Sequence, residues 1–169
     1  MPIPRKMRLF WPLLSGLLLA DCATKELAQE HLVPWVPEPV IGDVVRLTLA
    51  YNQGGAMSFS VGPYSRVIFS VTAMLAVVVL LVMYRRTDSR ATATLLALAL
   101  VMGGALGNLL DRLRSGRGVV DFIDLGIGDV RFWTFNVADI GVSIGAILLA
   151  WQLSRTPNGV RAAPGPPSR

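Results

Sequence analysis

Two acidic residues toward the C-terminal end of the chain stand beside strongly apolar sequence. Asp121 occurs in the stretch VVDF, just before an apolar run, and Asp139 occurs inside that run, in the stretch FNVAD. An ionisable side chain within a membrane-spanning segment is costly and commonly serves a function. Two carboxyl groups that share a proton can act as general acid and general base. The pair is therefore a candidate catalytic dyad, if the fold brings the two together.

The composition is that of a membrane protein. Of the 169 residues, 53% are hydrophobic and only 16% are charged, whereas ordinary soluble domains contain about 25% charged residues. Four apolar runs predict an all-α polytopic membrane protein with four transmembrane helices. The runs cover residues 9–24, 64–84, 91–110 and 133–153. They form one predicted domain, residues 1–155, followed by a tail, residues 156–169, whose Pro, Gly and Arg content predicts disorder.

Basic residues predict the orientation of the chain. The segments before the first run, between the second and third, and after the fourth contain nine Lys and Arg residues and one acid, Asp88. The nine are Arg5, Lys6, Arg8, Arg85, Arg86, Arg90, Arg155, Arg161 and Arg169. Because cytoplasmic loops are enriched in Lys and Arg, both termini are predicted to be cytoplasmic. Segments 25–63 and 111–132 are then expected on the outer side.

The same distribution argues against other classes of function. The net charge of +5 is explained by the cytoplasmic segments, and no basic and aromatic stripe accompanies it, so a nucleic-acid partner is not expected. A single Cys excludes an internal disulfide, and one His without a Cys cluster predicts no metal site. We expect no cofactor. His31 has no evident partner and is interpreted as a surface residue.

The N-terminal segment also has the form of a secretory signal. A basic start precedes an apolar run and then the sequence Leu19-Ala20-Asp21-Cys22, which is similar to a lipoprotein processing site. Signal cleavage requires small neutral residues beside the cut, and Asp21 occupies such a place. Three further apolar runs follow without a soluble domain. The segment is therefore predicted to be an uncleaved first helix.

Polar residues gather at the outer ends of the predicted helices. Asp21 and Lys25 share a face of the first helix, and Asn136 shares a face with Asp139 at the start of the fourth. On the third helix, Asn108, Asp111 and Arg112 lie together, beside glycines at 103, 104 and 107 that allow close helix contact. Simple structural hydrogen bonds between helices, with Arg112 paired to Asp111, are the alternative for any single residue. All these polar residues are expected at the same depth in the membrane, which favours a reaction centre over separate structural contacts.

The outer segments carry signals for extended structure. Residues 44–50 are rich in β-branched side chains and are followed by the turn sequence NQGG, which predicts a small sheet or hairpin on the outer leaflet. A plain surface loop is the alternative. The turn-rich residues 125–130 can fold back as a second hairpin and set Asp121 opposite Asp139.

Five short sequences in this chain resemble, in order, those of the bacterial lipoprotein signal peptidase family, also called signal peptidase II. They are DCATK at 21–25, NQGGA at 52–56, GGALGNLLDR at 103–112, VVDF at 119–122 and FNVAD at 135–139. One such match would be weak, whereas five in order on four spans are specific. Met57 departs from the pattern, because an aromatic residue is usual there. The departure concerns loop packing rather than chemistry.

The resemblance implies an aspartic endopeptidase that removes the signal peptide from prolipoproteins, cutting before the diacylglyceryl-modified cysteine. It implies that Asp121 and Asp139 are the catalytic dyad and that four further residues, Asn52, Asn108, Arg112 and Asn136, position the substrate backbone and the dyad. Asp21 would line the cleft. The implied enzyme lies in the inner (cytoplasmic) membrane, with its active site near the outer leaflet, contacts lipid and is expected to be monomeric.

One further motif and two alternative functions have to be considered. The sequence Gly126-Ile127-Gly128-Asp129 matches the Gly-x-Gly-Asp motif of another intramembrane aspartic protease family, but here it lies in a loop and is interpreted as a turn with Asp129 in solvent. Asp124 is expected to be an exposed or capping carboxylate. A proton-coupled transporter could also use intramembrane acids, although no internal repeat is visible and the acids do not lie at mid-membrane. A structural membrane subunit would use the polar residues for assembly only.

Overall fold

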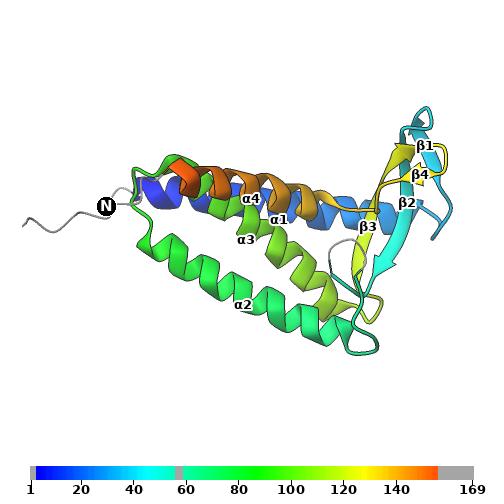
Figure 1. Ribbon diagram of the computed structural model, residues 1–169, viewed down its shortest axis with the longest axis horizontal. Helices are drawn as coiled ribbons and strands as arrows, with labels where there is room; N and C mark the ends of the chain where they lie inside the picture. Colours follow the sequence, from blue (N-terminus) through cyan, green and yellow to red (C-terminus); the bar gives the residue numbers. More distant parts are fainter. Residues whose placement is uncertain (1–2, 56–58, 156–169) are drawn as a thin grey trace, which may run out of the picture.

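The computed structural model describes residues 3–55 and 59–155, and within them four helices carry a small sheet at one end (Figure 1). The helices are α1 (Arg5–His31), α2 (Ser65–Arg86), α3 (Thr92–Arg114) and α4 (Val137–Arg155). The strands are β1 (Glu38–Ile41), β2 (Val45–Asn52), β3 (Val119–Ile127) and β4 (Val130–Arg131). Met57 and the tail at 156–169, on which two of the sequence predictions fall, lie outside the described residues.

Helix α3 is the central element, because it packs against α1, α2 and α4. Its glycines permit this: a Cβ at Gly104 would collide with the carbonyl oxygen of Ala138 on α4, and one at Gly103 would lie 3.1 Å from the carbonyl oxygen of Leu14 on α1. The close helix contacts expected from the glycines are thus present. At the end far from the sheet, Phe10 and Leu98 belong to the apolar core that joins α1, α2 and α3.

Two helices, α2 and α3, are long and apolar enough to cross a membrane by length and composition. The apolar part of α4, Val137–Gln152, is shorter, and α1 contains Asp21 and Lys25 within its length. The predicted runs at 64–84 and 91–110 correspond closely to α2 and α3. Many apolar side chains of α2 are exposed, as expected of a helix that faces lipid. The arrangement of four spans stays a prediction.

Three predicted helix spans need correction, and the first is longer than the predicted 9–24, because α1 runs from Arg5 to His31. The run at 133–153 does not begin as a helix, because α4 starts only at Val137 and residues 132–134 precede it without regular structure. At the other boundary, α3 continues past residue 110 to Arg114, which keeps Asp111 and Arg112 on the helix. Helix α1 runs without interruption through Asp21 and Cys22.

The sheet is antiparallel in the order β1-β2-β3-β4, and its central pair joins the two outer segments of the chain. Ala50 on β2 is opposite Asp121 on β3, and Asn52 is opposite Val119. The predicted strand at 44–50 is therefore confirmed as β2, and a plain loop there is wrong. The turn between β3 and β4 passes through Gly128 at φ 55°, so the predicted turn within 125–130 is also present. The sequence did not predict β3 as a strand.

Candidate active site

Asp121 lies on β3, where the sheet meets the helices. Its side chain is only 3% exposed. The amide nitrogen Nδ2 of Asn136 donates a hydrogen bond of 2.7 Å to its Oδ1 atom. The neighbouring residues Val119, Val120 and Phe122 are buried, and the last two pack in an apolar core with residues of α1 and β2. The carboxyl group is thus held in a largely water-excluded place, with the Asn136 amide as a close donor.

Asp139 lies in the first turn of α4, close to the point where that helix begins. The backbone N–H of Asp139 donates to Oδ1 of Asn136 at 3.0 Å, and the backbone N–H of Asn136 donates to Oδ2 of Asp139 at 3.3 Å. This reciprocal pairing is the geometry of a capping box, and it explains why the helix starts at Val137. The N-terminus of a helix also favours a negative charge. The sequence thus fixes both the helix start and the placement of this carboxylate.

Asn108 of α3 and Asn136 join the two carboxyl groups. Asn108 Nδ2 donates to Oδ1 of Asp139 at 2.8 Å, while Asn136 Nδ2 donates to Oδ1 of Asn108 at 3.1 Å and also to Asp121. Each acid therefore accepts a hydrogen bond from one of two amides that contact each other. Four of the residues singled out from the sequence are brought together here, from three separate elements.

Lys25 is a central residue of the site that the sequence prediction did not include. Its side chain is buried, and its ammonium group lies 2.7 Å from Asp21 Oδ2, 2.9 Å from Asp111 Oδ2 and 2.9 Å from Asn108 Oδ1. All three N–H bonds are thereby used. Because Asn108 Oδ1 accepts from Lys25, the Nδ2 end of that amide must point to Asp139. The spacing of Asp21 and Lys25 is visible in the sequence, but the contacts of Lys25 with Asn108 and Asp111 on α3 are not.

The two acids paired with Lys25 each hold the backbone beside one member of the candidate dyad. Asp21 Oδ1 accepts the N–H of Ala138 at 2.8 Å, and Asp111 Oδ2 accepts the N–H of Val120 at 3.1 Å. Asp21 has no exposed surface. That Asp21 lines the substrate cleft stays a prediction of the family resemblance.

Arg112 and Asn52 organise the loop that follows β2. Arg112 donates through Nη2 to the carbonyl oxygen of Gly54 at 2.7 Å and through Nη1 to that of Asn108 at 3.0 Å. Asn52 closes the turn by donating from Nδ2 to the Gly55 carbonyl and accepting the Gly54 N–H. The buried Nε of Arg112 has no hydrogen-bond partner within the described part of the chain. The alternative pairing of Arg112 with Asp111 is not formed, since Asp111 pairs with Lys25.

The surroundings of Asp121 give its carboxyl group a higher pKa than that of an ordinary aspartate. Burial raises the pKa of Asp121 to about 7, and the negative charge of Asp139 acts in the same direction. The amides of Asn136 and Asn52 oppose this by favouring the charged form. Near neutral pH, Asp121 can therefore hold a proton that a surface aspartate would have lost.

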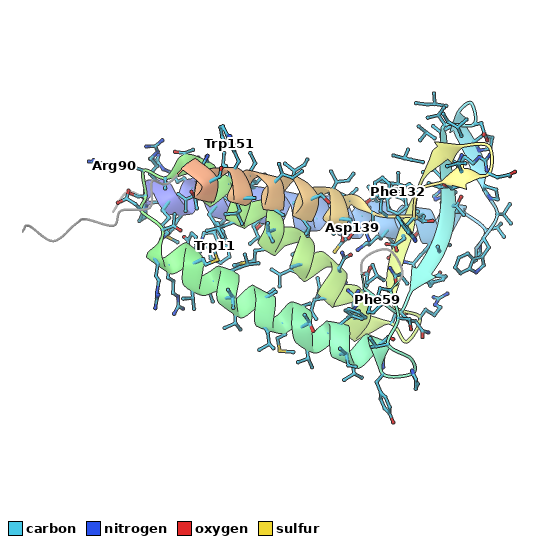
Figure 2. All side chains as sticks on the ribbon, in the orientation of Figure 1. Trp11, Phe59, Arg90, Phe132, Asp139 and Trp151 are labelled. Atoms are coloured by element: carbon cyan, nitrogen blue, oxygen red, sulfur yellow. The ribbon has the colours of Figure 1, made fainter. Side chains whose placement is uncertain are left out.

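An apolar pocket reaches Asp139 from the side of α4. It has a volume of about 290 Å³ and is lined by Phe132, Phe135, Asp139, Ile140, Ser143 and Ile144. Figure 2 shows Asp139 and Phe132 close to the point where α4 meets the sheet. A pocket of this character suits an apolar group placed next to a carboxylate.

Two other acids had been set aside, and the structure revises one of them. Asp124 is buried, accepts a hydrogen bond from Thr48 at 3.1 Å and pairs with Arg131 at 2.9 Å, so the expectation of an exposed or capping residue is wrong. Its role is to tie β3 to β2 and β4. Asp129 is exposed in the β3–β4 turn, as expected. In the segments that the structure describes, no three His, Cys, Asp or Glu residues are grouped to bind a metal.

The fold and the site place this chain among helical membrane enzymes. Two solved structures, both described as bacterial membrane enzymes, are similar to it: one has a TM-score of 0.77 and 25% sequence identity and covers 89% of this chain and 90% of its own. The other has a TM-score of 0.75 and 27% identity and covers 85% of this chain and 91% of its own. The family model of signal peptidase II matches residues 13–155, so the chain belongs to the signal peptidase II family.

Curated relatives agree with this assignment. The lipoprotein signal peptidase of Hydrogenovibrio crunogenus is 39% identical over 79% of this chain and 77% of its own. The lipoprotein signal peptidase of Photorhabdus laumondii is 40% identical over 85% of both chains, and that of Moorella thermoacetica is 41% identical over 83% of this chain and 90% of its own. The resemblance seen in the sequence is confirmed. Membership makes the chain a hydrolase of the protease class.

Proposed function

We propose that this protein is an intramembrane aspartic endopeptidase that removes the signal peptide from prolipoproteins by cleaving N-terminal to the diacylglyceryl-modified cysteine. The observation that carries the proposal is that Asp121 and Asp139 accept hydrogen bonds from two amides in mutual contact, Asn136 and Asn108. The relatives named lipoprotein signal peptidase support the substrate class. No cofactor is required by this chemistry.

The surroundings of the two acids suggest that they differ in protonation before the reaction begins. Asp121 is buried and its pKa is raised to about 7. Asp139 accepts from the Asn108 amide and from a backbone N–H at the start of α4, where a negative charge is favoured. In our proposal Asp121 holds the shared proton at rest and Asp139 is ionised. Such a division of roles is how two nearby carboxyl groups provide both an acid and a base.

The reaction then needs only the two acids and water. Asp139 takes a proton from a water molecule, whose oxygen forms a bond to the scissile carbonyl carbon, while Asp121 gives its proton to the carbonyl oxygen. The resulting tetrahedral diol collapses as the carbon–nitrogen bond breaks. The leaving amine takes the proton from Asp139, and a diol hydroxyl returns a proton to Asp121. Both acids end as they began.

The remaining residues have positioning roles in this proposal. Asn108 and Asn136 orient the carboxyl groups, and Asn52 and Arg112 shape the Gly54–Gly55 turn next to the substrate backbone. The free Nε–H of Arg112 can donate to a substrate carbonyl. The apolar pocket beside Asp139 suits the lipid-bearing or signal-peptide portion of the substrate.

The setting of the enzyme is part of the proposal. We infer a single catalytic domain, residues 1–155, with four spans, cytoplasmic termini and the dyad near the outer leaflet of the inner membrane. We expect a monomer surrounded by lipid, with a prolipoprotein as its partner and no nucleic acid.

A reconstituted assay tests the proposal. Purified protein in lipid vesicles should release the signal peptide from a diacylglyceryl-modified prolipoprotein. Asp121→Asn and Asp139→Asn should each lower the rate by about a thousandfold, because each removes one proton-transfer group. Asp129→Asn is the matched control, since Asp129 is exposed in a turn. Full activity of both dyad variants would refute the dyad, and acid-dependent ion flux without cleavage would favour a transporter.

A further inference from the structure

A second pocket, distinct in character from the apolar one, opens beside the turn that follows β2. It has a volume of about 470 Å³, and its walls include Trp35, Tyr51, Gln53 and Arg117. Asn52 and Gly54 also line it, so it is continuous with the turn that Arg112 holds at the candidate active site. A chain that leaves the dyad along this turn would enter the pocket.

Arg117 is fixed in this pocket by the backbone around it. The next residue, Gly118, has φ 98°, and a Cβ there would collide with the carbonyl oxygen of Asn52, so only glycine allows the two segments to lie this close. The Arg117 guanidinium lies 4.5 Å from the centre of the Tyr51 ring and donates to the Tyr51 hydroxyl at 3.0 Å. The side chain is therefore held by an aromatic partner.

Within the described part of the chain, no carboxylate pairs with Arg117. None of Arg66, Arg114 and Arg117 has a carboxylate within 4.0 Å among residues 3–55 and 59–155. Arg66 lies nearby, because its Nη1 donates to the carbonyl oxygen of Ser115 at 3.2 Å. Arg117 and Arg66 both carry a positive charge here, so an anionic group that enters the pocket would be attracted and would meet a donor already in place.

Trp35 forms another part of the pocket wall in an unusual conformation. Its φ is 66°, a left-handed value that is costly for a bulky residue, and its side chain is 66% exposed. The backbone is held there because the Trp35 N–H donates to the carbonyl oxygen of Leu49 at 2.9 Å. The exposed indole of Trp35, held in this strained conformation, offers a flat surface on which a substrate peptide can pack.

We propose that this pocket binds the polar residues that follow the lipid-modified cysteine and that Arg117 makes the enzyme prefer an acidic side chain there. The inference rests on the proposed function, because it assumes that the substrate crosses the dyad. The two pockets suit chemically different portions of the substrate. The apolar pocket beside Asp139 suits the lipid-bearing portion, whereas the polar, cationic pocket suits the soluble portion.

The test compares prolipoproteins that differ by one residue. An Asp replaces a Ser in turn at each of the first few positions after the cysteine, and kcat/KM is measured for each pair with reconstituted enzyme. At one position the wild type should favour Asp about fivefold, the upper range for a solvent-accessible ion pair. Arg117→Ala should abolish this ratio, and Arg117→Glu should invert it in favour of Ser. Because the ratio is taken within each enzyme, changes in overall rate cancel.

Arg114→Ala is the matched control, since it removes a nearby exposed arginine that does not line the pocket, and it should keep the preference. Equal ratios in the wild type and in Arg117→Ala overturn the proposal. An equal loss of the Asp preference in Arg114→Ala also overturns it, because the preference would then depend on the total positive charge of this surface and not on Arg117. If the wild type fails to cleave the Ser substrate, the proposed function itself is wrong.

Discussion

Asp121 is the residue whose protonation the proposed chemistry depends on, and this dependence can be measured. Its pKa is raised to about 7 by burial and by Asp139, so the proton is present below that pH and is lost above it. We predict that kcat/KM falls tenfold per pH unit once the pH passes about 7. A pH–rate profile of the reconstituted enzyme checks this. Asp129→Asn should leave the descending limb in place, whereas a rate that stays level well above pH 7 would contradict the assignment of the acid.

The residues of the site differ in how visible they are in the sequence. Asp121 and Asp139 stand out because acids beside apolar runs are rare, and Asn136 stands out because it is three positions before Asp139. The role of Asp111 could not be predicted, because its partners, Lys25 and the N–H of Val120, belong to other elements. Asp124 was interpreted wrongly for the same reason: Arg131 and Thr48 reach it only after the sheet has formed.

At the scale of elements, the position of α4 depends on glycines of α3. We predict that Gly104→Val moves α4 away, because a side chain there would collide with the Ala138 carbonyl, one residue before Asp139. Activity should fall sharply, and stability should fall by about 1–3 kcal/mol. Gly16→Ala on α1 is the control, since nothing lies within 4 Å of the added carbon. Gly16→Ala should raise the stability of the protein slightly. Thermal unfolding in detergent measures stability, and the cleavage assay measures activity. A fully active Gly104→Val would contradict the packing argument.

Lys25 joins the elements that hold the dyad, and its removal should uncouple them. Lys25→Met leaves the buried Asp21 and the half-buried Asp111 near each other without a counter-charge, and breaking a buried ion pair in this way typically costs about 3–5 kcal/mol. The Asn108 amide also loses a donor that fixes its orientation. We predict loss of both stability and cleavage.

A compensating variant separates these two effects of Lys25. Adding Asp111→Asn to Lys25→Met removes one of the stranded charges and should restore much of the stability, measured by thermal unfolding, while cleavage stays low. If the double variant regained full activity, Lys25 would act only through stability and not by orienting Asn108.

The elements themselves were predictable to different degrees. Apolar runs marked α2 and α3 well, because length and hydropathy are local properties. The start of α4 was placed four residues early, since Trp133 and Phe135 are apolar while the true boundary is set by the Asn136 cap. Strand β3 was missed because nearly all of its residues from Val119 to Asp124 are buried, so it lacks the alternation typical of a half-exposed strand.

On the scale of the whole molecule, the helices have lengths that suit a bilayer. At about 1.5 Å per residue, α1 is about 40 Å long and α4 about 28 Å, against a hydrocarbon core of about 30 Å. The sheet lies at one end of the helices (Figure 1). The polar network lies at that end, and the apolar core of α1, α2 and α3 lies toward the other. A single orientation would therefore put all the polar side chains of the site at one surface.

The basic residues predict which surface that is. Arg85, Arg86 and Arg90 lie at the end of the helices opposite to the sheet, and Arg90 is marked there in Figure 2. Because such clusters stay on the cytoplasmic side, reporter fusions after Arg90 and after Arg155 should be cytoplasmic, and a fusion near Trp35 should be external. A reporter enzyme that is active only outside the cell membrane, paired with one active only inside, gives opposite signals at each position. A reversed pattern would put the dyad on the cytoplasmic side, where the proposed substrate, with its cysteine at the outer leaflet, could not reach it.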